Sequence, residues 1–308
     1  MLEVEGLTKK YGNLTAIDHL SFTIEKGSIF GFVGPNGAGK TTTLKILATL
    51  LRPTSGRAWI AGEEVTGNPK RVRQLVGYMP DFFGVYDDLK VDEYLDFYAA
   101  SYGIPYFQRK RIIDDLLELI DLSHKRDAYV DSLSRGMKQR LCLSRCLVHD
   151  PALLILDEPA SGLDPRARME VKEILKELRN MGKTIIVSSH ILPELAEFCT
   201  HMGIIEAGHM IVNGTVEEIS RRAQSGRLIK ITVLDKLEEA VQLLQEQFGI
   251  QHLKAENNQI EFPFAGDDGE SSTILSALVS LQIPVASFTR VRSNMEDVFI
   301  ELTKGVVQ

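Results

Sequence analysis

The chain of 308 residues lacks any apolar run approaching the ~18 residues that a membrane-spanning helix requires. Its N-terminus, MLEVEGLTKK, lacks the charged-then-apolar form of a secretory signal peptide. A net charge of −7 disfavours general binding to nucleic acid, because a phosphate backbone requires a basic face. Internal repeats and low-complexity tracts are absent as well. Length and composition therefore predict a globular cytoplasmic protein of about two domains, with no nucleic-acid partner.

Cysteine is also scarce. Cys142 and Cys146 share one face of a predicted helix and Cys199 stands apart, so no metal-ligand spacing is present beyond a C-x-x-x-C. We interpret all three as small apolar side chains packed in a core rather than as a metal or redox centre. This cysteine usage predicts a reducing compartment.

A glycine-rich segment, GPNGAGKTT, follows the apolar run SIFGFV and precedes a helical pattern. Strand, glycine-rich turn and helix start together match the phosphate-binding loop G-x-x-x-x-G-K-[ST], whose backbone N–H groups converge on an anion. Lys40 can reach the β- and γ-phosphates, and the Thr41 hydroxyl suits Mg²⁺. The sequence therefore predicts a nucleoside triphosphate site. Its residues are Gly34, Pro35, Asn36, Gly37, Ala38, Gly39, Lys40, Thr41 and Thr42.

Strand and helix patterns alternate along the first two thirds of the chain. Residues 2–33 contain short runs typical of strands, and RAWIAGEEV predicts another strand. Between about residues 85 and 150, the apolar residues recur with the spacing of helices. The buried strand ALLILDEP, a helix and the buried strand KTIIVSSH then follow one another. This order indicates an α/β fold, with a parallel sheet covered by helices.

A polar segment, RRAQSG at residues 221–226, precedes a region with a different order of elements. A strand LIKITVLD, a helix, two short strands, a helix from about Ser272 to Leu281 and a strand PVASFTRV are predicted. This β-α-β-β-α-β order is typical of a ferredoxin-like α+β domain. We assign residues 227–308 to a small accessory domain of this kind, which includes a closing helix, NMEDVFIELTK.

Two adjacent carboxylates, Asp157 and Glu158, end the strand LLILDEP, at the strand end where α/β sheets bind their ligands. Asp157 suits a magnesium shell, and Glu158 can deprotonate a water that attacks the γ-phosphate. Capping of the following helix explains one carboxylate but not both. We therefore expect a metal ligand beside a general base.

Three further segments are weak signals when each is taken alone. LSRGM at residues 133–137 opens a helix, where Ser134 and the N–H groups offer a second anion site or an ordinary helix cap. SGLD at 161–164 and His190, which ends IIVSSH, are equally compatible with structural roles.

Together and in this order, the segments resemble the ATP-binding-cassette (ABC) ATPases over about residues 1–220. The resemblance implies a P-loop NTPase cassette with a parallel core sheet, N-terminal antiparallel strands and a helical subdomain at about 85–150. Residues 34–42 match the Walker A loop and 153–158 the Walker B strand. LSRGM matches the signature motif, in which Ser134 and Gly136 bind the partner subunit's γ-phosphate, and His190 the switch histidine. Tyr11, in KKYG, matches the aromatic residue that stacks on adenine.

This sequence departs from the family pattern at three positions. Arg135 replaces the usual second glycine of the signature motif, and Met137 replaces its usual glutamine. Asp81 follows GYMP, where glutamine is common, and an anionic side chain beside a triphosphate is tolerable mainly when it faces Mg²⁺. We favour a metal role for Asp81 over the alternative, a cap on the following turn.

The LSRGM variant and the tail MEDVFIELTKG look like those of ATPases that serve two-component, ABC-2 type exporters. This resemblance implies a homodimer or heterodimer that binds ATP and Mg²⁺ and drives a separate transmembrane permease from the inner face of the cell membrane. Phe82 and Phe83 are candidates to receive a permease helix, although burial in the protein's own core explains them equally well. The rival function is a soluble cassette ATPase acting on ribosomes or DNA. Such proteins usually carry two cassettes or a coiled-coil insertion, and neither is present.

Overall fold

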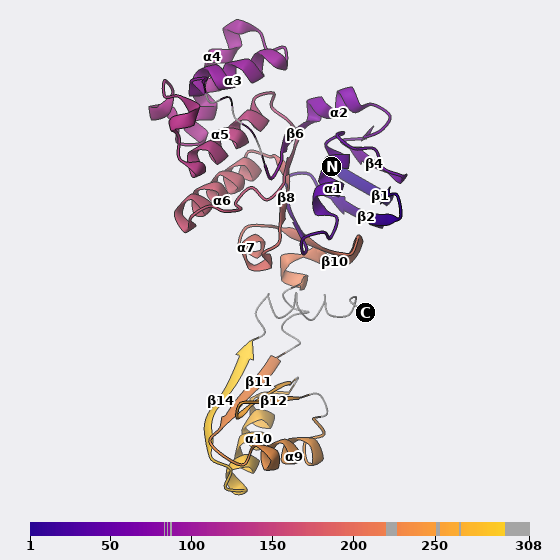
Figure 1. Cartoon of the computed structure of the whole chain (residues 1–308), viewed down its shortest axis with the longest axis vertical. Helices are drawn as coiled ribbons and strands as arrows, with labels where there is room; N and C mark the ends of the chain where they lie inside the picture. Colours follow the sequence, from indigo (N-terminus) through magenta and orange to yellow (C-terminus); the bar gives the residue numbers. More distant parts are fainter. Residues whose placement is uncertain are drawn as a thin grey trace. The chain divides into compact units, whose positions relative to one another are not determined.

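The computed structural model describes residues 1–82, 84, 86, 88–219, 227–250, 253–264 and 266–292 (Figure 1). It contains two compact units, the first running from Met1 to Val216 and the second beginning at Glu217. The polar segment at 221–226 and the closing helix predicted at 294–304 lie outside the described residues. No helix within the described ranges is long and apolar enough to cross a membrane.

A six-stranded sheet forms the centre of the first unit, in the order β10-β9-β3-β8-β7-β6. Five of its strands pair in parallel and β10 pairs antiparallel at one edge. Every residue of β3, β7 and β8 is buried, as expected for strands covered on both faces. Parallel strands end at one edge of a sheet, so the segments that follow β3, β7 and β8 meet there. The strands are β3 (Ile29–Val33), β6 (Val76–Met79), β7 (Leu153–Leu156), β8 (Thr184–Ser189), β9 (His201–Glu206) and β10 (His209–Thr215).

A second, antiparallel sheet of four strands has the order β2-β1-β4-β5. Phe22 of β2 stacks on Phe30 and Phe32 of β3, with ring centroids 5.5 and 5.7 Å apart, so the two sheets share a core. The elements are β1 (Leu2–Tyr11), β2 (Leu14–Ile24), β4 (Ser55–Ile60), β5 (Glu63–Glu64) and the helices α1 (Lys40–Leu47) and α2 (Pro69–Leu75). The predicted α/β class, with N-terminal antiparallel strands beside a parallel sheet, is confirmed.

Helices α3 (Val91–Ser101), α4 (Tyr106–Leu119) and α5 (Arg135–Leu147) lie within the stretch that the sequence predicts to be helical. Helix α5 is attached to β6 at its C-terminal end. A Cβ atom on Gly77 would lie 2.3 Å from the Cys146 carbonyl oxygen, so only glycine permits this approach. The Cys146 thiol donates to the Tyr78 carbonyl at 3.1 Å. All three cysteines are buried, in agreement with their predicted role in packing.

Two more helices follow strands of this sheet along the chain, α6 (Pro165–Asn180) after β7 and α7 (Leu192–Ala196) after β8. Asp164 caps α6 by accepting from the N–H groups of Arg166 and Ala167, both at 3.0 Å, and Pro165 occupies the first helical position. The sequence predicts α6 but misses the short helices α2 and α7.

The second unit has the predicted β-α-β-β-α-β order, and its antiparallel sheet has the order β12-β13-β11-β14. Alternate residues such as Ile229, Ile231 and Ile260 are buried in a core with the two helices. The elements are β11 (Arg227–Val233), α9 (Leu237–Glu246), β12 (Lys254–Glu256), β13 (Gln259–Pro263), α10 (Asp268–Ser280) and β14 (Val285–Arg292).

Candidate functional site

The loop between β3 and α1 has a backbone that requires glycine at two positions. Gly39, the N-cap of α1, has φ 106°, and a Cβ there would lie 2.6 Å from the Ala16 carbonyl oxygen. A Cβ on Gly34 would lie 2.3 Å from the Ile205 carbonyl oxygen. The loop is therefore packed closely from behind, while its other side borders a cleft of about 320 Å³. The cleft is lined by residues 35–42 with Ala16, Asp81, Glu158, Ser161 and His190.

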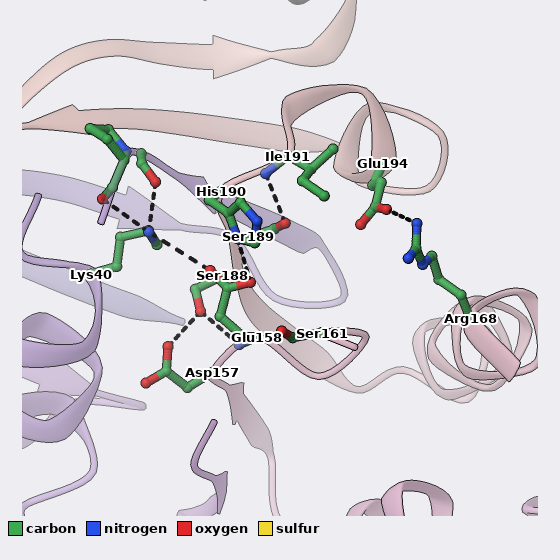
Figure 2. Close-up of polar contacts among 12 residues, drawn as sticks. Lys40, Asp157, Glu158, Ser161, Arg168, Ser188, Ser189, His190, Ile191 and Glu194 are labelled. Carbon is green, nitrogen blue, oxygen red and sulfur yellow. Dashed lines mark hydrogen bonds and ion pairs between the residues drawn. The ribbon is translucent and has the colours of Figure 1, made fainter. Parts of the chain in front are cut away.

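Lys40 projects into this loop from the first residue of α1 (Figure 2). Its ammonium donates to the carbonyl oxygens of Gly34 at 2.6 Å and Pro35 at 3.2 Å. The side chain is only 6% exposed, and its Nζ lies 3.8 Å from Glu158 Oε1. Burial lowers the pKa of Lys40, and the nearby carboxylates of Glu158 and Asp157 oppose that shift. The loop thus holds a buried cation whose charge is balanced chiefly by Glu158.

Asp157 is held by β8, the strand beside its own. The Ser188 hydroxyl donates to Asp157 Oδ1 at 2.6 Å and accepts from the Glu158 N–H at 2.9 Å (Figure 2). Asp157 is 1% exposed, yet its Oδ2 atom has no hydrogen-bond partner among the described residues. A buried carboxylate oxygen without a partner is costly, so this atom is suited to a ligand that the protein itself does not supply.

Glu158 has an unusual backbone, with φ 48° in the left-handed region that side chains other than glycine seldom adopt. Its Oε2 atom lies 3.1 Å from His190 Nδ1, at the end of β8. Burial raises the pKa of Glu158, and His190 and Lys40 oppose the rise. A carboxylate that lies between two nitrogen groups and has a raised pKa is suited to accept a proton.

The remaining predicted residues fall into two groups. Thr41, Thr42 and Asp81 border the same cleft as Glu158 and His190. Tyr11, Ser134 and Gly136 do not line it. Tyr11 is half-exposed at the end of β1, with the Lys9 ammonium 5.1 Å from its ring centroid.

Ser134 and Gly136 border a separate concavity of about 570 Å³ between α5 and α6. Ser134 caps α5 by accepting from the Met137 N–H at 3.3 Å. A Cβ on Gly136 would lie 2.9 Å from Ala167 Cβ, so glycine allows α5 and α6 to approach closely. Both residues therefore have clear structural roles within this chain.

Two buried polar residues at the site were not identified from the sequence. Ser188 connects both carboxylate residues, and the one available signal was a serine near the end of a fully buried strand. Gln139 of α5 donates to the Pro159 carbonyl at 2.6 Å, and nothing in the local pattern distinguishes it.

Comparison with protein families gives two matches on this chain. A model described as ABC transporter matches residues 17–161. A second model, described as ATP-binding protein DrrA1-3-like, C-terminal domain, matches residues 214–303. The two matches fall on the first and second units of the fold.

Individual proteins match over nearly the whole length. The Nod factor export ATP-binding protein I of Ralstonia nicotianae is 34% identical over 313 residues, which cover 98% of this chain and 94% of that protein. The bacitracin transport ATP-binding protein BcrA of Bacillus licheniformis is 34% identical over 308 residues, covering 99% and 98%. A solved structure of an ATP-binding subunit of an ABC transporter superposes with a TM-score of 0.65 at 30% identity, covering 72% of this chain and 92% of that one.

Replacement of Ser188 by alanine tests its contacts. Ser188→Ala leaves Asp157 Oδ1 and the Glu158 N–H without their partner, so we expect the free energy of unfolding to fall by about 1–3 kcal/mol. Chemical denaturation measures the change. Ser144→Ala is the matched control, because that buried hydroxyl donates to the Leu141 carbonyl within its own helix, at 2.8 Å. Equal losses in the two variants contradict the assignment of Ser188.

Proposed function

The chain belongs to the ABC transporter family, and on that premise we propose that it is the ATP-hydrolysing subunit of a two-component exporter. Nucleotide binding and ATP hydrolysis coupled to transport are the properties of this family. Two subunits, identical or different, would close around two ATP molecules and drive a separate permease from the inner face of the membrane. The relatives' names, Nod factor export and bacitracin transport, support transport over action on ribosomes or DNA.

One observation carries the enzymatic part of this proposal: Lys40, Glu158 and His190 converge on the phosphate loop. Lys40 binds the phosphates, because the carbonyl oxygens of Gly34 and Pro35 hold its positively charged ammonium at the phosphate loop. Glu158 takes the proton from the attacking water, and the Nδ1 atom of His190, 3.1 Å away, orients its carboxylate. The raised pKa of Glu158 makes it a stronger base than an exposed glutamate.

The site also fits a magnesium ion. The Oδ2 atom of Asp157 has no hydrogen-bond partner among the described residues and offers a hard oxygen ligand. The Thr41 hydroxyl and the Asp81 carboxylate border the same cleft, and we assign these three residues to the metal. When bound, Mg²⁺ neutralises charge on the phosphates.

Each ATP would lie between two subunits. Ser134 and Gly136 do not line the Walker A cleft of their own chain, which supports a role at the nucleotide of the partner. The N–H groups in the first turn of a helix such as α5 suit an anion. Tyr11, exposed at the end of β1, is available to stack on adenine.

The Phe82 side chain is 91% exposed, which argues against burial in the protein's own core. Phe83 lies outside the described residues. An aromatic side chain this exposed, next to Asp81 at the cleft, supports contact with a cytoplasmic helix of the permease.

Glu158→Gln keeps the shape of the proposed base and removes its proton affinity. We expect ATP turnover to fall by roughly 10²–10⁴-fold while ATP binding persists. Because the γ-phosphate then survives, ATP should trap a dimer in size-exclusion chromatography. Glu197→Gln, which changes an exposed carboxylate paired with Lys172, is the control. Near-normal hydrolysis by the first variant contradicts the assignment.

Asp81→Ala tests the metal site. If Asp81 holds Mg²⁺, the magnesium concentration for half-maximal hydrolysis should rise, and Asp81→Gln should recover much of the activity. If Asp81 instead caps the following turn, alanine should cost about 1 kcal/mol of stability and leave the magnesium dependence unchanged. A magnesium titration beside a melting curve separates the two roles.

Phe82→Ser tests the docking surface. Association with the permease, measured by co-purification from membranes, should weaken while basal ATPase is retained, because Phe82 contributes little to the core. Leu14→Ser, another exposed apolar residue, should leave association intact. Loss of both association and ATPase in Phe82→Ser shows that the residue supports the fold instead.

A further inference from the structure

Arg135, the first residue of α5, extends to the loop that follows Glu158. Its Nη2 atom donates to the Ser161 carbonyl oxygen at 3.4 Å. Arg135 occupies the signature position where the family usually has glycine, so glycine at that position would lack this contact. The helix start that is proposed to face the partner's ATP therefore also contacts a loop of its own chain.

Gly162 provides the surface on which the guanidinium lies. A Cβ on Gly162 would lie 2.3 Å from Arg135 Nη2, 2.6 Å from Cζ and 2.7 Å from Nη1. Gly162 also has φ 66°, a conformation that glycine adopts without strain. Arg135 and Gly162 are thus complementary: the contact requires a long planar cation on one side and no side chain on the other.

The same face of α5 holds this loop at a second point. Gln139, one helical turn after Arg135, donates to the Pro159 carbonyl at 2.6 Å. The Ser161 N–H donates to the Glu158 carbonyl at 3.1 Å, so the loop closes back on the residue with the left-handed backbone. A short series of contacts therefore leads from the guanidinium of Arg135 to the backbone of Glu158.

We propose that Arg135 is a positioning residue, which fixes the loop after Glu158 and so sets the geometry of the carboxylate that accepts the water proton. This inference rests on the proposed role of Glu158. In a dimer, the contact between Arg135 and this loop would make hydrolysis at one ATP depend on the position of α5, and the start of α5 faces the other ATP. Arg135 thus links the two nucleotide sites of a dimer through a single chain.

A double-mutant cycle on ATP turnover tests the proposal, with the purified full-length chain, ATP and Mg²⁺. Arg135→Ala should lower kcat by about 10–100-fold with little change in KM, because small misplacements of catalytic groups cost this much. Gly162→Ala should lower kcat similarly, since its methyl group displaces the guanidinium. The double variant should have a kcat no lower than the worse single variant, because both changes break one contact.

Melting curves separate an effect on kcat from an effect on the stability of the fold. Alanine at φ 66° carries its own strain, which should lower the melting temperature equally with or without Arg135. Arg111→Ala, an exposed arginine on α4, is the control and should leave kcat unchanged.

Two results overturn the inference. If the losses in kcat multiply in the double variant, Arg135 and Gly162 act independently. If Arg135→Ala raises KM for ATP and leaves kcat unchanged, the guanidinium contacts the partner's nucleotide instead. Glu158→Gln in the same assay tests the premise separately. Full turnover by that variant contradicts the role of Glu158 as the base. If that variant is inactive and the losses in the Arg135 and Gly162 variants multiply, the role of Glu158 stands and only the role of Arg135 is contradicted.

Discussion

Opposite charges are buried together at one edge of the central sheet, and the fold has to bring them there as a set. The ammonium of Lys40 and the carboxylates of Asp157 and Glu158 are poorly accessible to water, and a single buried charge without the others would be strongly destabilising. Lys40 follows β3 and the carboxylates follow β7, while β8 lies between and supplies Ser188. A parallel sheet brings these distant segments to one edge.

Much of this arrangement was predictable because its signals are local. The phosphate loop is specified by glycines at positions where the backbone allows nothing larger, and β3, β7 and β8 are short apolar runs because both faces of each are covered. In the second unit, β11 and β13 alternate buried residues with more exposed ones, so the order of elements there could also be predicted correctly.

The features that sequence reasoning missed depend on pairing between distant segments. Ser188 bonds to Asp157 because Leu156 pairs with Val187, which places the two following residues side by side. The residues near Ser188 in the chain do not indicate which residues of β7 and β8 pair. The contacts of Gln139 and Arg135 likewise exist only once α5 has packed beside the loop after β7. The helices α2 and α7 are too short to produce a clear period.

The attachment of α5 to β6 at Gly77 has a mechanical consequence. With the Cys146 carbonyl against Gly77 and its thiol bonded to Tyr78, the C-terminal end of the helix cannot slide along the sheet without breaking close backbone contacts. A displacement of α5 that preserves these contacts is therefore a rotation about its C-terminal end. The displacement is greatest at the opposite end, where the first turn of the helix meets the loop after β7.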